Sequence, residues 1–221
     1  MQGSITVLII VELTFTTTAK ARKLYPVDEG PRDVSFKVFR NKLIEAVKEH
    51  NTPFILTTLH PKIHLSFGGH FGVKDFLETW KPYSPDSALW NELSTILTLG
   101  GTFRTSGGKR VFWAPYTFSA FPDDVDAYEY ASIVGANVKV RSQPSTTARI
   151  VTILSYDIVK ATFPSSDNKR KDDTPGWVKV VLPDGTNGYV ANRYVRSPID
   201  HRLGFEKIRG KWLITAFIGG D

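Results

Sequence analysis

Hydrophobic and polar positions follow two different periods along this chain. Between residues 33 and 51, apolar side chains recur three or four positions apart, which is the spacing of one face of an α-helix. The same spacing returns over shorter stretches at residues 53–59, 73–80 and 86–99. After Gly100 and Gly101 the period falls to two, so the pattern predicts helices first and strands afterwards.

The second half of the chain reads as short strands separated by turn residues. A first hairpin is predicted where residues 102–104 and 110–113 flank Gly107 and Gly108. Five further segments then follow at regular intervals, as an all-β barrel requires: residues 137–141, 150–154, 158–162, 177–182 and 188–191.

A strong hairpin is predicted at the C-terminal end, outside the barrel pattern. Residues 202–208 and 211–218 alternate and flank Arg209 and Gly210. An isolated hairpin is only marginally stable in water, so it must pack on another unit. The helical N-terminal part has little sheet of its own. We therefore expect antiparallel pairing between this hairpin and a strand before Asp126.

These elements predict an α+β fold of two units, for which 221 residues leave room. The first unit is an α+β domain of residues 25–131 together with 200–221. The second is a small all-β barrel of residues 132–198, set into the first. Residues 24–32 carry two prolines and a glycine, so we expect a linker there.

Residues 1–21 have the features of a secretory signal. The apolar run at residues 5–11 is too short to span a bilayer, and Ala19-Lys20-Ala21 fits the small-residue pattern that signal peptidase cuts. The alternative is a simple N-terminal strand. Only the signal interpretation places the protein in the periplasm or outside the cell.

Charge and composition restrict the class of partner. The net charge is +6, which favours anionic partners such as cell-wall polymers, membrane surfaces or nucleic acid. The densest basic run, Lys169 to Lys171, is followed by Asp172 and Asp173, which is more typical of a solvated loop than of a polyanion site. We therefore expect no nucleic-acid partner and no stable membrane insertion, and the sequence leaves the oligomeric state open. The chain has no cysteine, which excludes thiol nucleophiles, thiolate zinc sites and disulfides.

The sequence gives no motif for catalysis or metal binding. His60, His64 and His70 lie close together, with Asp75 and Glu78 nearby, but their spacing matches no helical zinc motif. We expect these histidines to be solvated or structural. A serine nucleophile elbow, a phosphate-binding glycine loop and a dinucleotide fingerprint are all missing from the sequence. The prediction is a protein that is not an enzyme and has no metal or cofactor.

Three strings in the barrel segment carry a family resemblance. They are Asn137-Val138-Lys139-Val140-Arg141-Ser142-Gln143-Pro144, Gly176-Trp177-Val178-Lys179-Val180, and the run from Asp184-Gly185 through Gly188-Tyr189-Val190 to Tyr194-Val195. Together they resemble the opening, the central strand and the close of the bacterial SH3 domain family. Gln143 and the long loop at residues 162–175 depart from the family pattern, and either departure can alter a binding surface. The resemblance implies a ligand-binding barrel in a protein of the bacterial cell envelope.

The strand that begins at Trp177 points to the binding surface. Side chains alternate between faces along a strand, so Val178 and Val180 face the core while Trp177 and Lys179 face outward. A large exposed aromatic side chain usually marks a contact. Tyr194 resembles the tyrosine that lines the ligand groove of SH3 folds. The predicted ligand-binding residues are Trp177, Tyr189, Tyr194 and Arg141, and the alternative is that the loop at residues 162–175 or the other domain covers Trp177.

The leading interpretation is a non-catalytic exported protein that binds a cell-envelope peptide or peptidoglycan through this aromatic face. A second is a small-molecule site or weak hydrolase in the N-terminal unit, lined by Phe67, Trp80, Trp90 and Trp113. That unit is similar in architecture to the nuclear transport factor 2-like superfamily, on the glycine-containing segment before residues 72–80 and the closing hairpin. A third interpretation is a structural scaffold for a partner protein.

Overall fold

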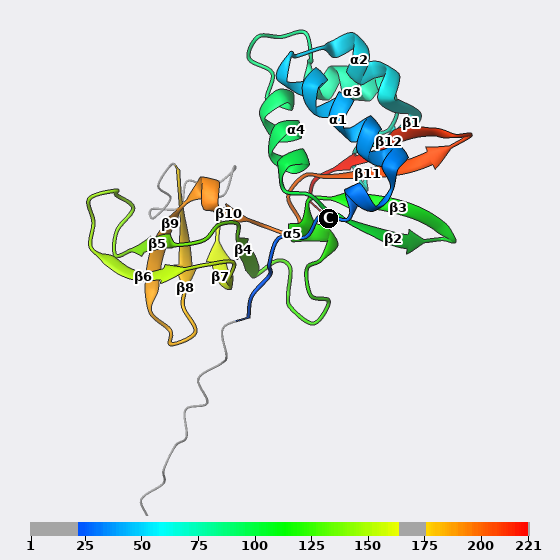
Figure 1. The fold of residues 1–221 in the computed structure, drawn as a ribbon. Helices are drawn as coiled ribbons and strands as arrows, with labels where there is room; N and C mark the ends of the chain where they lie inside the picture. Colours follow the sequence, from blue (N-terminus) through cyan, green and yellow to red (C-terminus); the bar gives the residue numbers. More distant parts are fainter. Residues whose placement is uncertain (1–21, 164–175, 221) are drawn as a thin grey trace, which may run out of the picture.

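The computed structural model describes residues 22–163 and 176–220. An α+β domain and a small curled β-sheet lie side by side, and the N-terminal segment runs between them (Figure 1). Residues 1–21, with the predicted signal sequence, lie outside the described residues. Among the helices that are described, none is both long and apolar enough to cross a membrane.

The α+β domain is built on one five-stranded sheet with the C-terminal hairpin at its centre. The strand order is β1 (Leu59–His64), β12 (Lys211–Ile218), β11 (Arg202–Ile208), β3 (Lys109–Ala114) and β2 (Thr102–Ser106). β11 pairs antiparallel with β3, and β12 pairs parallel with β1. The prediction that the hairpin completes the N-terminal domain is confirmed, because without β11 and β12 the strands β1 and β3 would have no connection.

Four helices cover one face of this sheet (Figure 1): α1 (Val34–Lys48), α2 (Thr52–Thr58), α3 (Val73–Trp80) and α4 (Leu89–Thr98). α1 begins at Asp33, whose carboxylate accepts a hydrogen bond from the backbone N–H of Phe36. Phe36 is fully buried between the helices and the sheet, with its ring 4.4 Å from that of Phe112 and 4.9 Å from that of Trp212.

The structure differs from the predicted elements at one strand of this domain. β1 begins at Leu59, the last residue of the helix predicted at residues 53–59, and it includes Pro61. β1 is an edge strand, where a residue without a backbone N–H can be tolerated.

The barrel is a seven-stranded sheet curled around its own core. The strand order is β10 (Val195–Arg196), β4 (Tyr130–Ile133), β7 (Ile158–Thr162), β8 (Trp177–Val181), β9 (Asn187–Ala191), β5 (Val138–Arg141) and β6 (Ile150–Leu154). The five predicted strands are all present. The sequence missed β4 and β10, which extend the sheet at one edge and place its first strand at Tyr130, before the predicted boundary at residue 132. Between β9 and β10, the short 3-10 helix η2 (Asn192–Tyr194) carries Tyr194.

The two units share a small core, to which the short helix α5 (Tyr116–Ser119) contributes. Leu24, Tyr116, Phe121 and Ile158 form a buried cluster that joins the N-terminal segment, the α+β domain and the barrel. The barrel is also set between two elements of the other domain, because the chain enters it after α5 and leaves it into β11. The position of the barrel relative to the α+β domain is therefore fixed by the shared buried cluster as well as by the two chain connections.

The segment predicted to be a linker, residues 24–32, instead forms hydrogen bonds with both units and so ties them together. The backbone N–H of Leu24 donates to the carbonyl of Tyr156 in the barrel at 2.7 Å, and the N–H of Glu29 donates to the carbonyl of Gly101 in the α+β domain at 2.8 Å. Lys23 forms an ion pair with the buried carboxylate of Asp157 at 2.9 Å. The prolines and the glycine shape the segment, but its backbone groups are used in pairing.

Candidate functional site

The outer face of β8 carries the aromatic residue that the sequence singled out. Val178 and Val180 are fully buried, whereas Trp177 and Lys179 point outward and are half-buried. Gly176 precedes Trp177 with φ of +81°, a value that favours glycine. Its carbonyl accepts a hydrogen bond of 2.8 Å from the N–H of Asn192. This bond joins the start of β8 to η2, and so brings Trp177 close to Tyr194.

A groove of about 310 Å³ opens beside these two aromatic side chains. Tyr194 is 37% exposed at its wall, and its carbonyl accepts a hydrogen bond of 3.0 Å from the N–H of Val134. The guanidinium of Arg141 is held at one edge, because Nη1 donates to the carbonyl of Ala148 at 2.7 Å. The groove is lined by Ala136, Asn137, Val138, Lys139, Arg141, Thr146, Trp177, Ala191, Arg193 and Tyr194.

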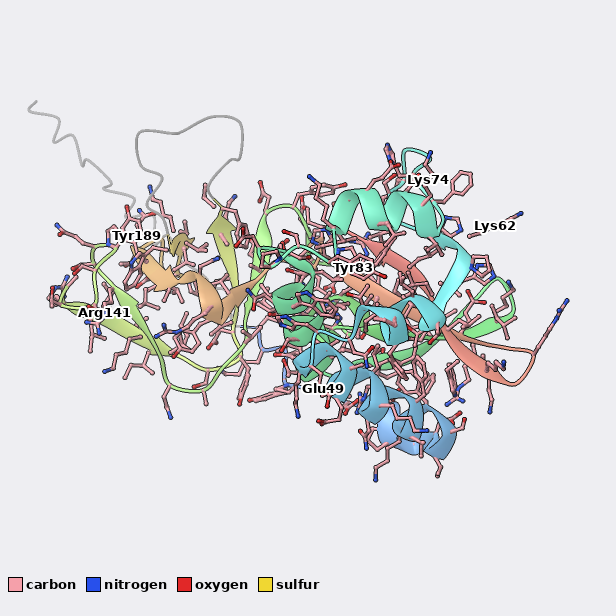
Figure 2. The ribbon with its side chains drawn as sticks, turned by 90° about the horizontal axis from the view of Figure 1, so that it is seen from above. Glu49, Lys62, Lys74, Tyr83, Arg141 and Tyr189 are labelled. Atoms are coloured by element: carbon pink, nitrogen blue, oxygen red, sulfur yellow. The ribbon has the colours of Figure 1, made fainter. Side chains whose placement is uncertain are left out.

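Tyr189 lies beside this groove and not in its lining. On β9 it pairs with Arg141 of β5 and with Lys179 of β8, so all three side chains share the outward face. Figure 2 shows Arg141 and Tyr189 on the part of the barrel that is away from the α+β domain. Three of the four predicted ligand-binding residues thus line one hollow, and the fourth is their neighbour on the same surface.

The charged side chains that line the groove are all cationic. Lys139, Arg141 and Arg193 contribute three cationic groups, and among the described residues no carboxylate lines the groove. The guanidinium carbon of Arg193 lies 4.9 Å from the centre of the Tyr194 ring. Residues 136–196 contain ten Lys and Arg against five Asp and Glu, so this segment accounts for five of the six net charges of the chain. Such a surface attracts anionic ligands.

Two of these cations were missed in the sequence, although a signal existed. Lys139 alternates with Val138 and Val140, so it shares the outward face with Arg141. Arg193 directly precedes Tyr194. Once Arg141 and Tyr194 were candidates, the same reasoning would have added both neighbours.

A second, larger hollow lies on the other side of Trp177, between the barrel and α4. This interdomain cleft has a volume of about 660 Å³. Glu92, Thr95 and Leu99 line it from the helix side, and Trp177 and Arg193 line both the cleft and the groove. In the described part of the structure, Trp177 is therefore not covered by the α+β domain, since a hollow separates it from α4. The other predicted cover, the loop at residues 162–175, lies outside the described residues from 164 to 175.

A partly buried polar cluster forms the floor of the cleft. Nη2 of Arg196 donates to Glu92 and to the carbonyl of His201, at 2.7 Å in each case. Asp200 accepts a hydrogen bond of 3.0 Å from the N–H of Ser197. Burial raises the pKa of the Asp200 carboxyl above its usual value and lowers the pKa of the His201 imidazole. This cluster could not be predicted from the sequence, because Glu92 is more than a hundred residues from its partners.

The residues proposed for a pocket in the N-terminal unit do not converge, so that predicted lining is wrong. Phe67 and Trp113 line a hollow of about 420 Å³ on the sheet face opposite the helices. Trp80 instead stacks on Phe217 at 4.4 Å, and Trp90 is buried and stacks on a histidine. Helical spacing directs both tryptophans into packing between the helices and their neighbours.

The three neighbouring histidines are spread over the β1 edge. Nδ1 of His60 accepts a hydrogen bond from the backbone N–H of Lys62 at 3.1 Å. His64 is exposed, and Nδ1 of His70 lies 3.9 Å from the carboxylate of Asp75. Within residues 22–163 and 176–220, no three His, Asp or Glu side chains are grouped so that they could hold a metal ion.

Comparison with known proteins identifies the barrel. Residues 136–196 match the family model described as bacterial SH3 domain. Neither the search of curated proteins nor the search of solved structures gave a match. The likeness of the N-terminal unit to the nuclear transport factor 2-like superfamily therefore stays a prediction. The barrel of this chain is a bacterial SH3 domain.

Proposed function

We propose that this chain is a non-catalytic exported bacterial protein whose SH3 domain binds a cell-envelope ligand, a peptide or the peptide part of peptidoglycan. The observation that carries the proposal is the groove in which Trp177 and Tyr194 stand beside three cations. Bacterial SH3 domains are in general binding modules, which agrees with a surface of this kind.

The groove has the chemistry to hold an extended peptide. Aromatic rings offer a large contact area with little conformational freedom to lose, and stacked aromatic pairs contribute about 0.5–1.5 kcal/mol beyond burial of their area. Lys139 and Arg193 are exposed at the groove and can pair with carboxylates of a ligand. In this proposal Trp177 and Tyr194 supply most of the affinity, and the cations speed association with acidic ligands.

Export is the second part of the proposal. The apolar run and the Ala-Lys-Ala sequence before residue 22 support a cleaved signal, and an SH3 domain of the bacterial type suits an envelope protein. A periplasmic or secreted location would place the groove next to its ligand. N-terminal sequencing of the protein recovered from the cell envelope would test this part, with an N-terminus close to Arg22 expected.

The binding itself is tested by incubating the immobilised full chain with purified peptidoglycan and, separately, with total envelope protein. We expect retention of peptidoglycan or of a defined envelope protein, and the two arms identify the source of the peptide. Lys139→Glu should weaken retention roughly fivefold, as about 1 kcal/mol of charge interaction is lost.

Lys42→Glu is the matched control, because Lys42 is an exposed lysine on α1, away from the groove. It should bind like the wild type. Absence of any retained ligand, or equal losses in Lys139→Glu and Lys42→Glu, would count against binding at the groove.

A further inference from the structure

Trp177 stands between two hollows that share part of their lining. The groove on the barrel and the cleft toward α4 have Trp177 and Arg193 in common. We propose that the two form one continuous binding surface, in which an extended acidic peptide lies in the groove, passes Trp177 and continues into the cleft against α4. This inference rests on the proposed function and adds the α+β domain as a second part of the site.

The sizes of the two hollows favour a joint site. Ligand sites commonly occupy about 300–1,000 Å³, so the groove at about 310 Å³ stands at the lower limit of that range. The cleft adds about 660 Å³ directly beside it. A peptide that fills the groove alone would be short, whereas a longer one must leave it past Trp177 or Arg141. At the Trp177 end the groove adjoins the cleft, because Trp177 and Arg193 line both.

The chemistry of the two hollows differs in a way that defines the ligand. The groove lining is cationic, and so it suits carboxylates. In the cleft, Glu92 pairs with Arg196 at 2.7 Å, and Arg193 and Asp200 add one basic and one acidic group. Burial keeps the pKa of His201 below its usual value, which leaves the imidazole neutral near pH 7. The cleft therefore suits an uncharged, hydrogen-bonding stretch of backbone, and the ligand is acidic in one part and neutral in the next.

The walls of the cleft are held in place before any ligand binds. Arg196 of β10 joins Glu92 of α4 across its floor, and Lys23 joins the N-terminal tie to Asp157 of the barrel. Leu24 and Ile158 also share the buried cluster at the junction. A preorganised cleft reduces the entropy lost when a ligand is bound across both domains.

Thr95 is a position at which a substitution can change the cleft while the fold is kept. It is exposed on α4, and its hydroxyl donates to the carbonyl of Asn91 one turn earlier. Thr95→Trp would fill the helix side of the cleft. Ser94→Trp is the matched control, because Ser94 is the exposed neighbour of Thr95 and is not among the cleft residues.

The test uses the full chain and two capped peptides of equal charge. One is Glu-Gly-Glu-Gly, and the other is the same tetrapeptide extended at both ends by Ser-Ala-Ser-Ala. We expect the longer peptide to bind at least tenfold more tightly. In amide NMR spectra both peptides should shift Trp177 and Tyr194, and only the longer one should shift Thr95. Thr95→Trp should remove the gain, and Ser94→Trp should keep it.

The outcomes separate the two proposals. Equal affinities, with shifts confined to the groove, would overturn the continuous site and leave the proposed function standing. Lack of binding by either peptide, in a chain that retains peptidoglycan or an envelope protein, would overturn the continuous site alone, and failure to bind any of these ligands would overturn both. Equal effects of Thr95→Trp and Ser94→Trp, or a Thr95 shift produced by a peptide-free glycan fragment of the cell wall, would overturn the assignment of the cleft to a peptide.

Discussion

Removing the ammonium group of Lys23 should destabilise the junction between the two units. Nζ of Lys23 donates to Oδ1 of Asp157 and to the carbonyl of Ser155, at 2.9 Å in each case. The Asp157 side chain is only 5% exposed, whereas that of Lys23 is 37% exposed. In Lys23→Met the buried carboxylate would keep its hydrogen bond from the backbone N–H of Ser155 but lose its only ion-pair partner in the described structure.

The expected loss follows from this partial burial. Removing one member of a fully buried ion pair costs about 3–5 kcal/mol. Water can reach the lysine end of this pair, so we expect about 2–3 kcal/mol for Lys23→Met. For a chain of this length, each kcal/mol lowers Tm by about 2–4 °C, so the Tm should fall by roughly 4–12 °C.

Thermal unfolding followed by tryptophan fluorescence measures this loss. Lys23→Met combined with Asp157→Asn should recover much of the stability, because no unpaired buried charge remains. Lys37→Met, which removes an exposed lysine on α1, should leave the Tm unchanged. A Tm change below 1 °C in Lys23→Met would refute the view that the N-terminal segment ties the barrel to the α+β domain.

Three further substitutions test the core and the cleft. Phe36→Ala removes a fully buried ring and should reduce the free energy of unfolding by about 3–5 kcal/mol in urea titrations. Burial raises the pKa of Asp200, so the folded chain holds a proton that the unfolded chain releases, and wild-type stability falls as the pH rises from about 3.8 through the folded pKa. Asp200→Asn should lack that fall, and parallel stability profiles of the two proteins over this range would disprove the effect. Burial lowers the pKa of His201, so wild-type stability rises as the pH increases toward 6.5, and His201→Asn should lack this gain when unfolding is measured between pH 5 and 7.

Elements with a strong local pattern could be predicted from the sequence. The helix at residues 73–80 and the strands at residues 202–208 and 211–218 were predicted with the bounds that the structure gives. β4 and β10 were missed because they are short and are strands only through pairing with each other and with β7. The pairing role of residues 24–32 was hidden for the same reason, since their partners lie far away in the sequence.

The candidate site shows the same division. The alternation of side chains along β8 was sufficient to predict that Trp177 points outward. It could not reveal which part of the molecule Trp177 faces. That depends on α4, which approaches the barrel only because the barrel is set between β3 and β11. Glu92 and His201 meet in the cleft through this arrangement, and no spacing in the sequence relates them.

We propose that Trp177 contacts the envelope ligand directly, and peptidoglycan binding tests this claim. Sedimentation of the full chain with purified peptidoglycan should be compared for wild type, Trp177→Ala and Tyr83→Ala, the last removing a 71% exposed aromatic ring of the α+β domain. We expect Trp177→Ala to weaken binding by at least about 30-fold, as for a central aromatic contact, with an unchanged far-UV circular dichroism spectrum. Tyr83→Ala should bind like the wild type. Wild-type binding by Trp177→Ala, or loss of its folded spectrum, would contradict the claim.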